Sequence, residues 1–235
     1  MTIPIAMGHV RQCVASAGYA VVRQCGFTDG VTVDEARVRR LLAPLGRLSE
    51  RDGGVAVWPV RPVTGRPGAT FSVRSGAALL HTDAAYRAHP EDLVALLCVR
   101  PASDGGVSEL LHHQDARVAL SPEIAAELGQ PQWTWQPPDE FGGSATESLA
   151  VLAPDRVRWR RDNLVAAAAL LPVADAWQAH LQAASGLRRV TLGTDDLLVF
   201  SNHRVLHGRT AFTDPGRFLL RVRLWGGPEL PGEDA

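Results

Sequence analysis

Two histidines and one aspartate have the residue types and the spacing that could bind a metal ion. His81 and Asp83 stand two positions apart in "AALLHTD", and side chains two positions apart in a β-strand point to the same face. His207 lies much further along the chain, in "NHRVLHGRTAF". Two imidazoles and one carboxylate can hold non-haem Fe(II) and leave coordination positions open. Zinc accepts the same ligand types, so these residues alone leave the metal undecided.

Three arginines share one face of a predicted strand over residues 217–225. Arg217, Arg221 and Arg223 alternate with apolar residues in "RFLLRVRLW". Guanidinium groups on a strand whose other face is buried need anions to compensate their charge. A carboxylate is their natural partner, because it accepts two parallel hydrogen bonds from one guanidinium. We therefore expect a carboxylate-bearing cosubstrate or substrate near the metal; a solvent-facing row of arginines is the alternative.

The composition excludes several classes of chemistry. All 24 basic residues are arginine, and a chain without lysine has no Schiff-base lysine and no P-loop lysine. The net charge of -1 argues against a nucleic-acid or anionic-membrane partner. The three cysteines lack CxxC spacing, which argues against a disulfide framework or a thiolate zinc site. We expect a cytoplasmic protein with a small-molecule substrate, no nucleic acid and no membrane segment.

The elements that must position these residues are mostly strands. Short apolar runs bounded by Gly, Pro and Asp predict strands over 54–60, 69–75, 77–83, 92–100, 107–113, 189–193, 196–202, 204–212 and 217–225. Helical patterns occupy residues 32–46, 121–129 and 163–186. The fold class is therefore mainly β with flanking helices (α+β), with a closed or sandwiched β core.

We expect one domain over residues 1–235, with an α/β lead-in over 1–53 and the β core over 54–225. The core then carries a helical and loop insertion at about 120–187. Within that insertion, the Pro- and Gly-rich stretch 130–148 is long for a simple connection and is a candidate functional loop.

Taken together, "HTD", "GGVS" at 105–108, "NHRVLHGRTAF" and the R-x-x-x-R of Arg217 and Arg221 resemble one known group. It is the taurine dioxygenase (TauD/TfdA) and clavaminate synthase-like group of Fe(II)/2-oxoglutarate-dependent oxygenases. The motifs occur in the family's order over about residues 54–225, which is more specific than any one of them. The resemblance implies a double-stranded β-helix, or jelly roll, with the metal at one mouth.

The resemblance also implies roles for individual residues. His81, Asp83 and His207 would be the Fe(II) ligands. Arg217 would bind the distal carboxylate of 2-oxoglutarate, assisted by the hydroxyl of Ser108.

Arg221 occupies the position that meets an anionic substrate group in some relatives. The hairpin between His207 and Arg217 is shorter than in many clavaminate synthase-like members, so the arginine that takes 2-oxoglutarate is less firmly assigned than the metal triad.

The activity implied is a hydroxylation, or another C–H oxidation, that uses O2 and 2-oxoglutarate and releases succinate and CO2. The substrate would be small and carboxylate-bearing, such as an amino acid or a natural-product intermediate. Two alternatives remain at this point: a non-catalytic jelly-roll metal-binding protein and a zinc hydrolase. The oligomeric state is not indicated by the sequence.

Other conspicuous residues have simpler interpretations. Arg209 in "HGR" is expected to form a structural ion pair. The arginines of "VRWRRDN" over 157–163 are expected to form a solvated charge cluster, with substrate-carboxylate binding as the less favoured hypothesis. Trp133 and Trp135 fit either a substrate pocket or a core position.

Overall fold

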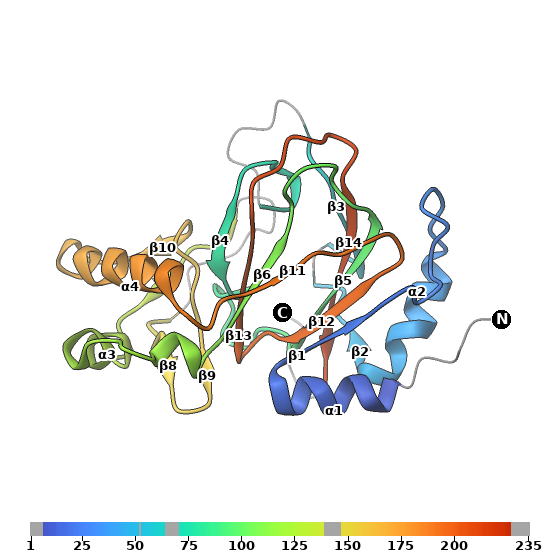
Figure 1. The fold of residues 1–235 in the computed structure, drawn as a ribbon. Coiled ribbons are helices and arrows are strands. Elements are labelled where there is room, and N and C mark those ends of the chain that lie inside the picture. Colours follow the sequence, from blue (N-terminus) through green and yellow to red (C-terminus); the bar gives the residue numbers. More distant parts are fainter. Residues whose placement is uncertain (1–6, 52, 64–70, 139–146, 227–235) are drawn as a thin grey trace.

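Two antiparallel sheets face each other and form the body of the protein (Figure 1). The computed structural model describes residues 7–51, 53–63, 71–138 and 147–226. The six-stranded sheet contains, in spatial order, β1 (Tyr19–Val22), β12 (Leu197–Ser201), β5 (Leu93–Arg100), β14 (Phe218–Trp225) and β2 (Arg47–Leu48), and β3 (Val57–Val60) also pairs with β14. The four-stranded sheet contains β11 (Arg188–Val190), β6 (Ser108–His112), β13 (Val205–Arg209) and β4 (Ala78–His81).

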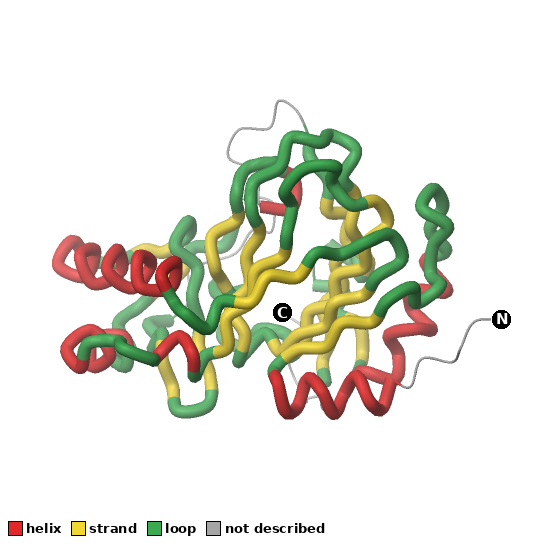
Figure 2. The backbone as a smooth tube through the Cα atoms, viewed as in Figure 1, coloured by secondary structure: helices red, strands yellow, loops and turns green. Residues whose placement is uncertain are grey.

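Helices cover the outer faces of both sheets (Figure 2). Helices α1 (Met7–Ala17) and α2 (Glu35–Leu42) pack on the six-stranded sheet through one apolar cluster. Helices α3 (Pro122–Leu128) and α4 (Leu171–Ala183) share a second cluster with residues of the four-stranded sheet. Two short hairpins complete this side: β7 (Thr134–Trp135) with β10 (Leu164–Val165), and β8 (Leu152–Ala153) with β9 (Arg156–Val157). Each sheet therefore has one face on helices and one face toward the other sheet.

A third apolar cluster lies between the sheets, and the arginines in and directly before β14 are on the same side of the sheet as this cluster. Its members include Val94, Cys98, Leu110, Leu198, Phe200 and Leu219. On β14, alternate residues from Leu220 pack on the outer face, whereas Leu219 points between the sheets. Arg217, Arg221 and Arg223 have the same parity as Leu219, and their exposed fractions are low. Arg217 and Arg223 are therefore buried and the side chain of Arg221 is only 13% exposed, so the solvent-facing alternative is wrong.

Most predicted strands are present, but two predicted elements differ. The strand expected over 69–75 is a turn of 3-10 helix at Phe71–Val73, and residues 64–70 lie outside the described residues. The helix expected over 163–186 begins only at Leu171 and places Pro172 in its first turn. Proline is favoured there because its missing N–H would break a hydrogen bond further inside a helix. No helix in the described parts of the chain has the length and apolarity needed to cross a membrane.

Candidate active site

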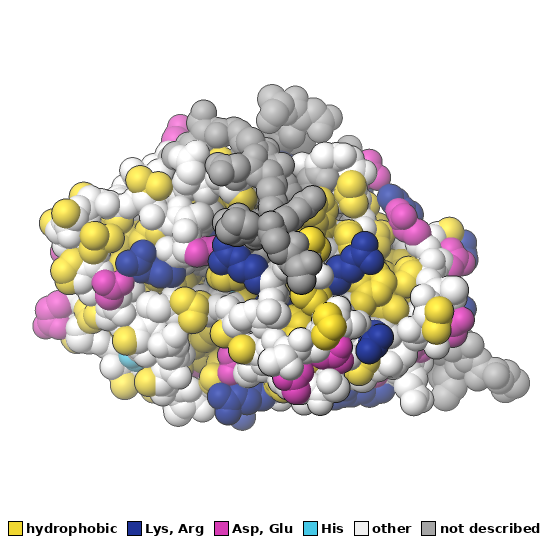
Figure 3. All heavy atoms as spheres, turned by 90° about the horizontal axis from the view of Figure 1, so that it is seen from above, with side chains coloured by type: hydrophobic (Ala, Val, Ile, Leu, Met, Phe, Trp, Pro, Cys, Tyr) yellow, Lys and Arg dark blue, Asp and Glu magenta, His cyan; other side chains and the backbone are white. Residues whose placement is uncertain are grey.

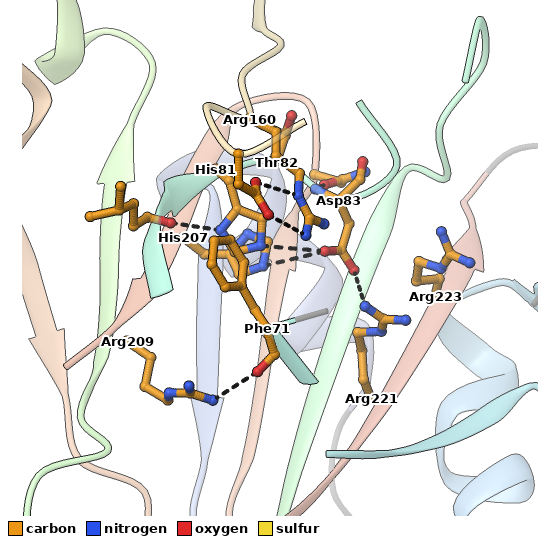
Figure 4. Close-up of polar contacts among 12 residues, drawn as sticks. Phe71, His81, Thr82, Asp83, Arg160, His207, Arg209, Arg221 and Arg223 are labelled. Carbon is orange, nitrogen blue, oxygen red and sulfur yellow. Dashed lines mark hydrogen bonds and ion pairs between the residues drawn. The ribbon is translucent and has the colours of Figure 1, made fainter. Parts of the chain in front are cut away.

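His81, Asp83 and His207 converge between the sheets (Figure 4). His81 ends β4 and pairs in register with His207 on β13, and Asp83 follows β4 by two residues. The Asp83 Oδ1 atom lies 3.7 Å from His81 Nε2 and 3.6 Å from His207 Nε2. One candidate ligand atom from each residue lies within 4.8 Å of the other two. The structure thus brings together the three residues that the sequence analysis selected as a metal site.

The imidazole of His81 is oriented by a backbone contact. Its Nδ1 atom lies 2.8 Å from the backbone oxygen of Leu79. A carbonyl oxygen only accepts, so Nδ1 is the donor in this contact, and Nε2, which lies near Asp83, is the ring nitrogen placed to bind a metal. A hydrogen bond of this kind on the second ring nitrogen is the usual support for a metal-binding histidine. The rings of His81 and His207 are 4.2 Å apart between centroids.

The electrostatics of the triad favour the protonation states that bind a metal. Burial alone raises the pKa of the Asp83 carboxyl, but Arg221 and the two histidines hold that pKa well below its usual value. The Nη1 atom of Arg221 is 3.2 Å from Asp83 Oδ2. Burial, with the nearby His81, lowers the pKa of His207 well below its usual value. At neutral pH the triad therefore offers a carboxylate and a neutral His207 imidazole.

Asn202 holds Asp83 in place, and the sequence analysis missed this residue. The backbone N–H of Asp83 donates to Asn202 Oδ1 at 2.8 Å. The Nδ2 atom of Asn202 donates to the backbone oxygens of Asp83 at 3.0 Å and Glu91 at 2.9 Å. Only 1% of Asn202 is exposed. A polar residue directly after the apolar strand "LLVFS" is the sequence signal that points to it, because a buried amide needs such partners.

Arg217, directly before β14, and the two arginines of β14 meet different partners. Arg223 Nη1 forms an ion pair with Glu91 Oε2 at 3.2 Å, and Arg221 pairs with Asp83. No carboxylate among the described residues pairs with Arg217, whose Nη1 is buried without a hydrogen-bond partner. An unpartnered buried donor of this charge indicates a site for an anion.

Burial lowers the pKa of Arg217 to about 10, which still leaves the guanidinium charged at neutral pH.

A neighbouring glycine, Gly106, makes room for the side chain of Arg217. Gly106 has φ +65, and a Cβ built there would lie 2.9 Å from Arg217 Nε. The "GGVS" motif therefore allows the backbone to approach Arg217 closely. Seen from above, basic side chains flank the centre of the face, and all of them are arginines because the chain has no lysine (Figure 3).

Arg209 binds backbone carbonyls, so the expected ion pair is wrong. Its Nη atoms donate to three backbone oxygens in the segment 71–76, over distances of 2.6 to 3.3 Å. These carbonyls bind both terminal nitrogens of the guanidinium without an acidic residue, and Nε is buried without a hydrogen-bond partner. Ser108 lies opposite Arg209 in the β6–β13 ladder and is 5% exposed, so its side chain is on the same face as that of Arg209.

The segment 157–163 forms a wall of the site, and the solvated charge cluster expected there is wrong for its inner arginines. Arg160 is 6% exposed and donates to both carboxylate oxygens of Asp162, at 2.9 and 3.1 Å. Its guanidinium lies 4.9 Å from the Phe71 ring centroid, and that ring is 5.0 Å from the His81 ring. The hairpins β7–β10 and β8–β9 bring the segment 157–163 next to the triad. The charge pattern of the segment alone could not predict this position.

Two tryptophans and a second buried arginine support that wall. Trp133 and Trp135 are fully buried in the outer cluster beside α3 and α4, so they are core residues. The Nε1 of Trp135 donates to the backbone oxygen of Arg160 at 3.0 Å. Arg158 donates to three backbone oxygens within residues 85–88, directly after Asp83. The wall and the loop after the triad are thus tied to each other.

The comparisons with known proteins agree with this architecture. The family model described as "Taurine catabolism dioxygenase TauD, TfdA family" matches residues 4–166 and 165–223. The chain belongs to the TauD/TfdA family. An L-asparagine oxygenase of Streptomyces coelicolor is 33% identical over 216 residues, which are 86% of this chain and 58% of the relative. This TauD-family chain therefore spans less than two thirds of that relative's length.

Two solved structures share the fold of this TauD-family protein. An asparagine oxygenase in complex with Fe(II), 2S,3S-3-hydroxyasparagine and succinate has a TM-score of 0.76 and 21% identity, with 94% of this chain and 78% of that chain covered. The non-heme iron oxygenase OrfP in complex with Fe and alpha-ketoglutaric acid has a TM-score of 0.73 and 19% identity, with 96% and 81% covered. The predicted double-stranded β-helix is therefore confirmed.

We expect the metal-free protein to lose stability as the pH falls from about 7 to about 5. The pKa of His207 is depressed in the folded state by burial, so the unfolded chain takes up a proton first as the pH falls below the ordinary histidine value. One such histidine changes the free energy of unfolding by at most about 1.4 kcal/mol per pH unit. Urea unfolding at both pH values measures the loss. His207→Gln should reduce it, and an unchanged pH dependence in that variant would contradict the assignment.

Proposed function

We propose that this TauD-family protein is an Fe(II)- and 2-oxoglutarate-dependent oxygenase that hydroxylates, or otherwise oxidises, a C–H bond of a small carboxylate-bearing molecule. The observation that carries the proposal is the buried, unpartnered Nη1 of Arg217 in the same inter-sheet space as the His81, Asp83 and His207 cluster. Family membership supports it. Both features favour this function over a zinc hydrolase and over a non-catalytic metal-binding protein.

His81, Asp83 and His207 would hold the Fe(II) ion. Their donor set suits that metal, because two imidazoles and one carboxylate occupy one face and leave the others open. The Nδ1 contact of His81 and the Asn202 contacts of Asp83 support the ligand geometry before any metal binds. When bound, iron with 2-oxoglutarate and O2 supplies the oxidising power for the C–H bond, and the products are the hydroxylated substrate, succinate and CO2.

Arg217 would bind the distal carboxylate of 2-oxoglutarate, with the hydroxyl of Ser108 as a second donor. Arg221 and Arg223 already face Asp83 and Glu91, so Arg217, directly before β14, is the arginine of this row with a charge to offer to the cosubstrate. A guanidinium in a buried setting binds a carboxylate more strongly than one in water, because the low local dielectric strengthens the contact.

Arg221 would bind an anionic group of the substrate. Its charge is compensated by Asp83 in the metal-free site. A divalent cation bound to Asp83 would offset the negative charge that now compensates Arg221. The guanidinium of Arg221 would then attract a second anion. Among solved structures of similar fold, the asparagine oxygenase complex contains 2S,3S-3-hydroxyasparagine, and a further complex of OrfP contains (3S)-hydroxy-L-Arg. We infer that the substrate is an amino acid or a similar small carboxylate.

An anaerobic titration tests the metal and the cosubstrate together. Fe(II) followed by 2-oxoglutarate should produce a weak visible charge-transfer band that needs both additions. His207→Ala should abolish the band, since the variant lacks a ligand. Succinate release in air, with a panel of amino acids, then identifies substrates. Bound metal without a band would overturn the proposal in favour of a zinc or non-catalytic site.

Arg217→Ala should weaken 2-oxoglutarate binding about 100-fold, or by about 2.7 kcal/mol, because it leaves a buried carboxylate unpaired. Arg221→Ala should instead raise the KM of the substrate and change the 2-oxoglutarate requirement much less. The band titration and the substrate dependence of succinate release separate the two effects. The opposite ranking would exchange the roles of the two arginines.

Gly106→Ala should weaken 2-oxoglutarate binding about tenfold, because the added methyl displaces Arg217. Gly53→Ala is the matched control: Gly53 has φ +63, and a Cβ there meets nothing within 4 Å. Both variants add a similar backbone strain of about 1 kcal/mol. Equal 2-oxoglutarate affinity in the two variants, measured by the band titration, would argue against a role of Gly106 in placing Arg217.

A further inference from the structure

Arg209 connects β13 to the segment 71–76 (Figure 4). Its Nη1 donates to the backbone oxygen of Phe71 at 3.3 Å, and its Nη2 donates to those of Arg74 at 2.7 Å and Gly76 at 2.6 Å. Arg209 is 7% exposed. Hydrogen bonds from a charged donor are stronger than those between neutral groups, and they are strongest when shielded from water. One guanidinium therefore organises the backbone of this segment.

The segment 71–76 places an aromatic ring beside a candidate metal ligand. The ring of Phe71 lies 5.0 Å from that of His81 and 4.9 Å from the guanidinium of Arg160. Two backbone hydrogen bonds also tether the segment: Val63 N–H donates to Val73 at 2.9 Å, and Phe212 N–H donates to Ser75 at 3.0 Å.

Arg209 also neighbours the proposed cosubstrate arginine. The guanidinium carbons of Arg209 and Arg217 lie 4.8 and 4.9 Å from the centroid of one ring, that of Phe212. Arg209 Nε and Arg217 Nη1 are both buried without a hydrogen-bond partner, and no carboxylate in the described part of the chain pairs with either residue. Burial, with the charge of Arg217, lowers the pKa of Arg209 to about 10, so the two guanidinium groups repel each other in this buried setting. An anion bound at Arg217 would relieve that repulsion.

We propose that Arg209 is a positioning residue that couples cosubstrate binding to the placement of Phe71 against His81. This inference rests on the proposed function, because it takes 2-oxoglutarate as the anion at Arg217. The bound carboxylate offsets the charge of Arg217 and so weakens its repulsion of Arg209. This stabilises the arrangement in which Arg209 donates to the backbone oxygens of 71–76. The coupling is reciprocal: a segment held in place by Arg209 makes 2-oxoglutarate bind more tightly.

Arg158 provides a matched control. It is 8% exposed and, like Arg209, donates to three backbone oxygens, those of Ala85, Arg87 and Ala88. It does not share the Phe212 ring. Arg158→Gln thus removes the same kind of interaction without touching the cosubstrate arginine.

Amide hydrogen exchange by mass spectrometry tests the coupling without turnover. The Zn(II)-loaded protein, in which the metal is redox-inert, is compared with and without 2-oxoglutarate. In the wild type, 2-oxoglutarate should slow exchange in 71–76 by about tenfold. Arg209→Gln should abolish that slowing and weaken 2-oxoglutarate binding about tenfold. Arg158→Gln should speed exchange in 85–88 and keep the response of 71–76.

Two results would overturn the inference. One is a wild-type segment 71–76 whose exchange does not respond to bound 2-oxoglutarate; this measurement needs no variant. The other is an Arg209→Gln protein that responds as the wild type does. If Arg209→Gln does not fold, Arg209→Lys keeps the charge but not the planar fork, and it should reduce the response. Absence of the Fe(II)–2-oxoglutarate band would instead refute the proposed function itself.

Discussion

The pairing of buried guanidinium groups with oxygen atoms is the constraint on which the site depends. A charge between two sheets is costly unless a partner compensates it. Arg223 has Glu91, Arg221 has Asp83, and Arg160 has Asp162. The first two pairs join β14 to the segment that follows β4, and Asp83 is at the same time a member of the candidate metal triad. Arg217 departs from the pattern, and its unmatched buried donor is the basis for the carboxylate site that we propose there.

Two further arginines each bind several backbone oxygens through a planar arrangement of donors that lysine lacks. Arg158 and Arg209 each bind three backbone oxygens, and each thereby holds a loop next to the triad. A guanidinium offers five donors in a planar fork, whereas an ammonium group offers three around a point charge. Every basic residue of this chain is arginine. In the loops at 71–76 and 85–88, several backbone carbonyls accept hydrogen bonds from Arg209 and Arg158 and not from a neighbouring strand.

Much of the β core follows from local patterns. The alternation of "RFLLRVRLW" correctly separates the buried face of β14 that meets the helices from the face that carries arginines. The segments at 69–75 and 157–163 could not be assigned in the same way. The backbone of residues 71–76 is organised by Arg209, and short hairpins bring Trp159 to Thr82. Both are contacts between residues far apart in the chain.

The sequence by itself determined which residues can ligate a metal and which face of β13 and β14 carries His207, Arg221 and Arg223, because side-chain alternation is a local property of an extended chain. Asp83 lies beyond the end of β4, so alternation along a strand did not set its position. It also determined that several guanidinium groups would need anions. Only the tertiary structure decided which anion each one meets. Arg221 and Arg217 have the same type and the same parity, yet the first faces Asp83 and the second faces no carboxylate of the described chain. Partner choice depends on how the two sheets face each other, and that is set by the whole fold.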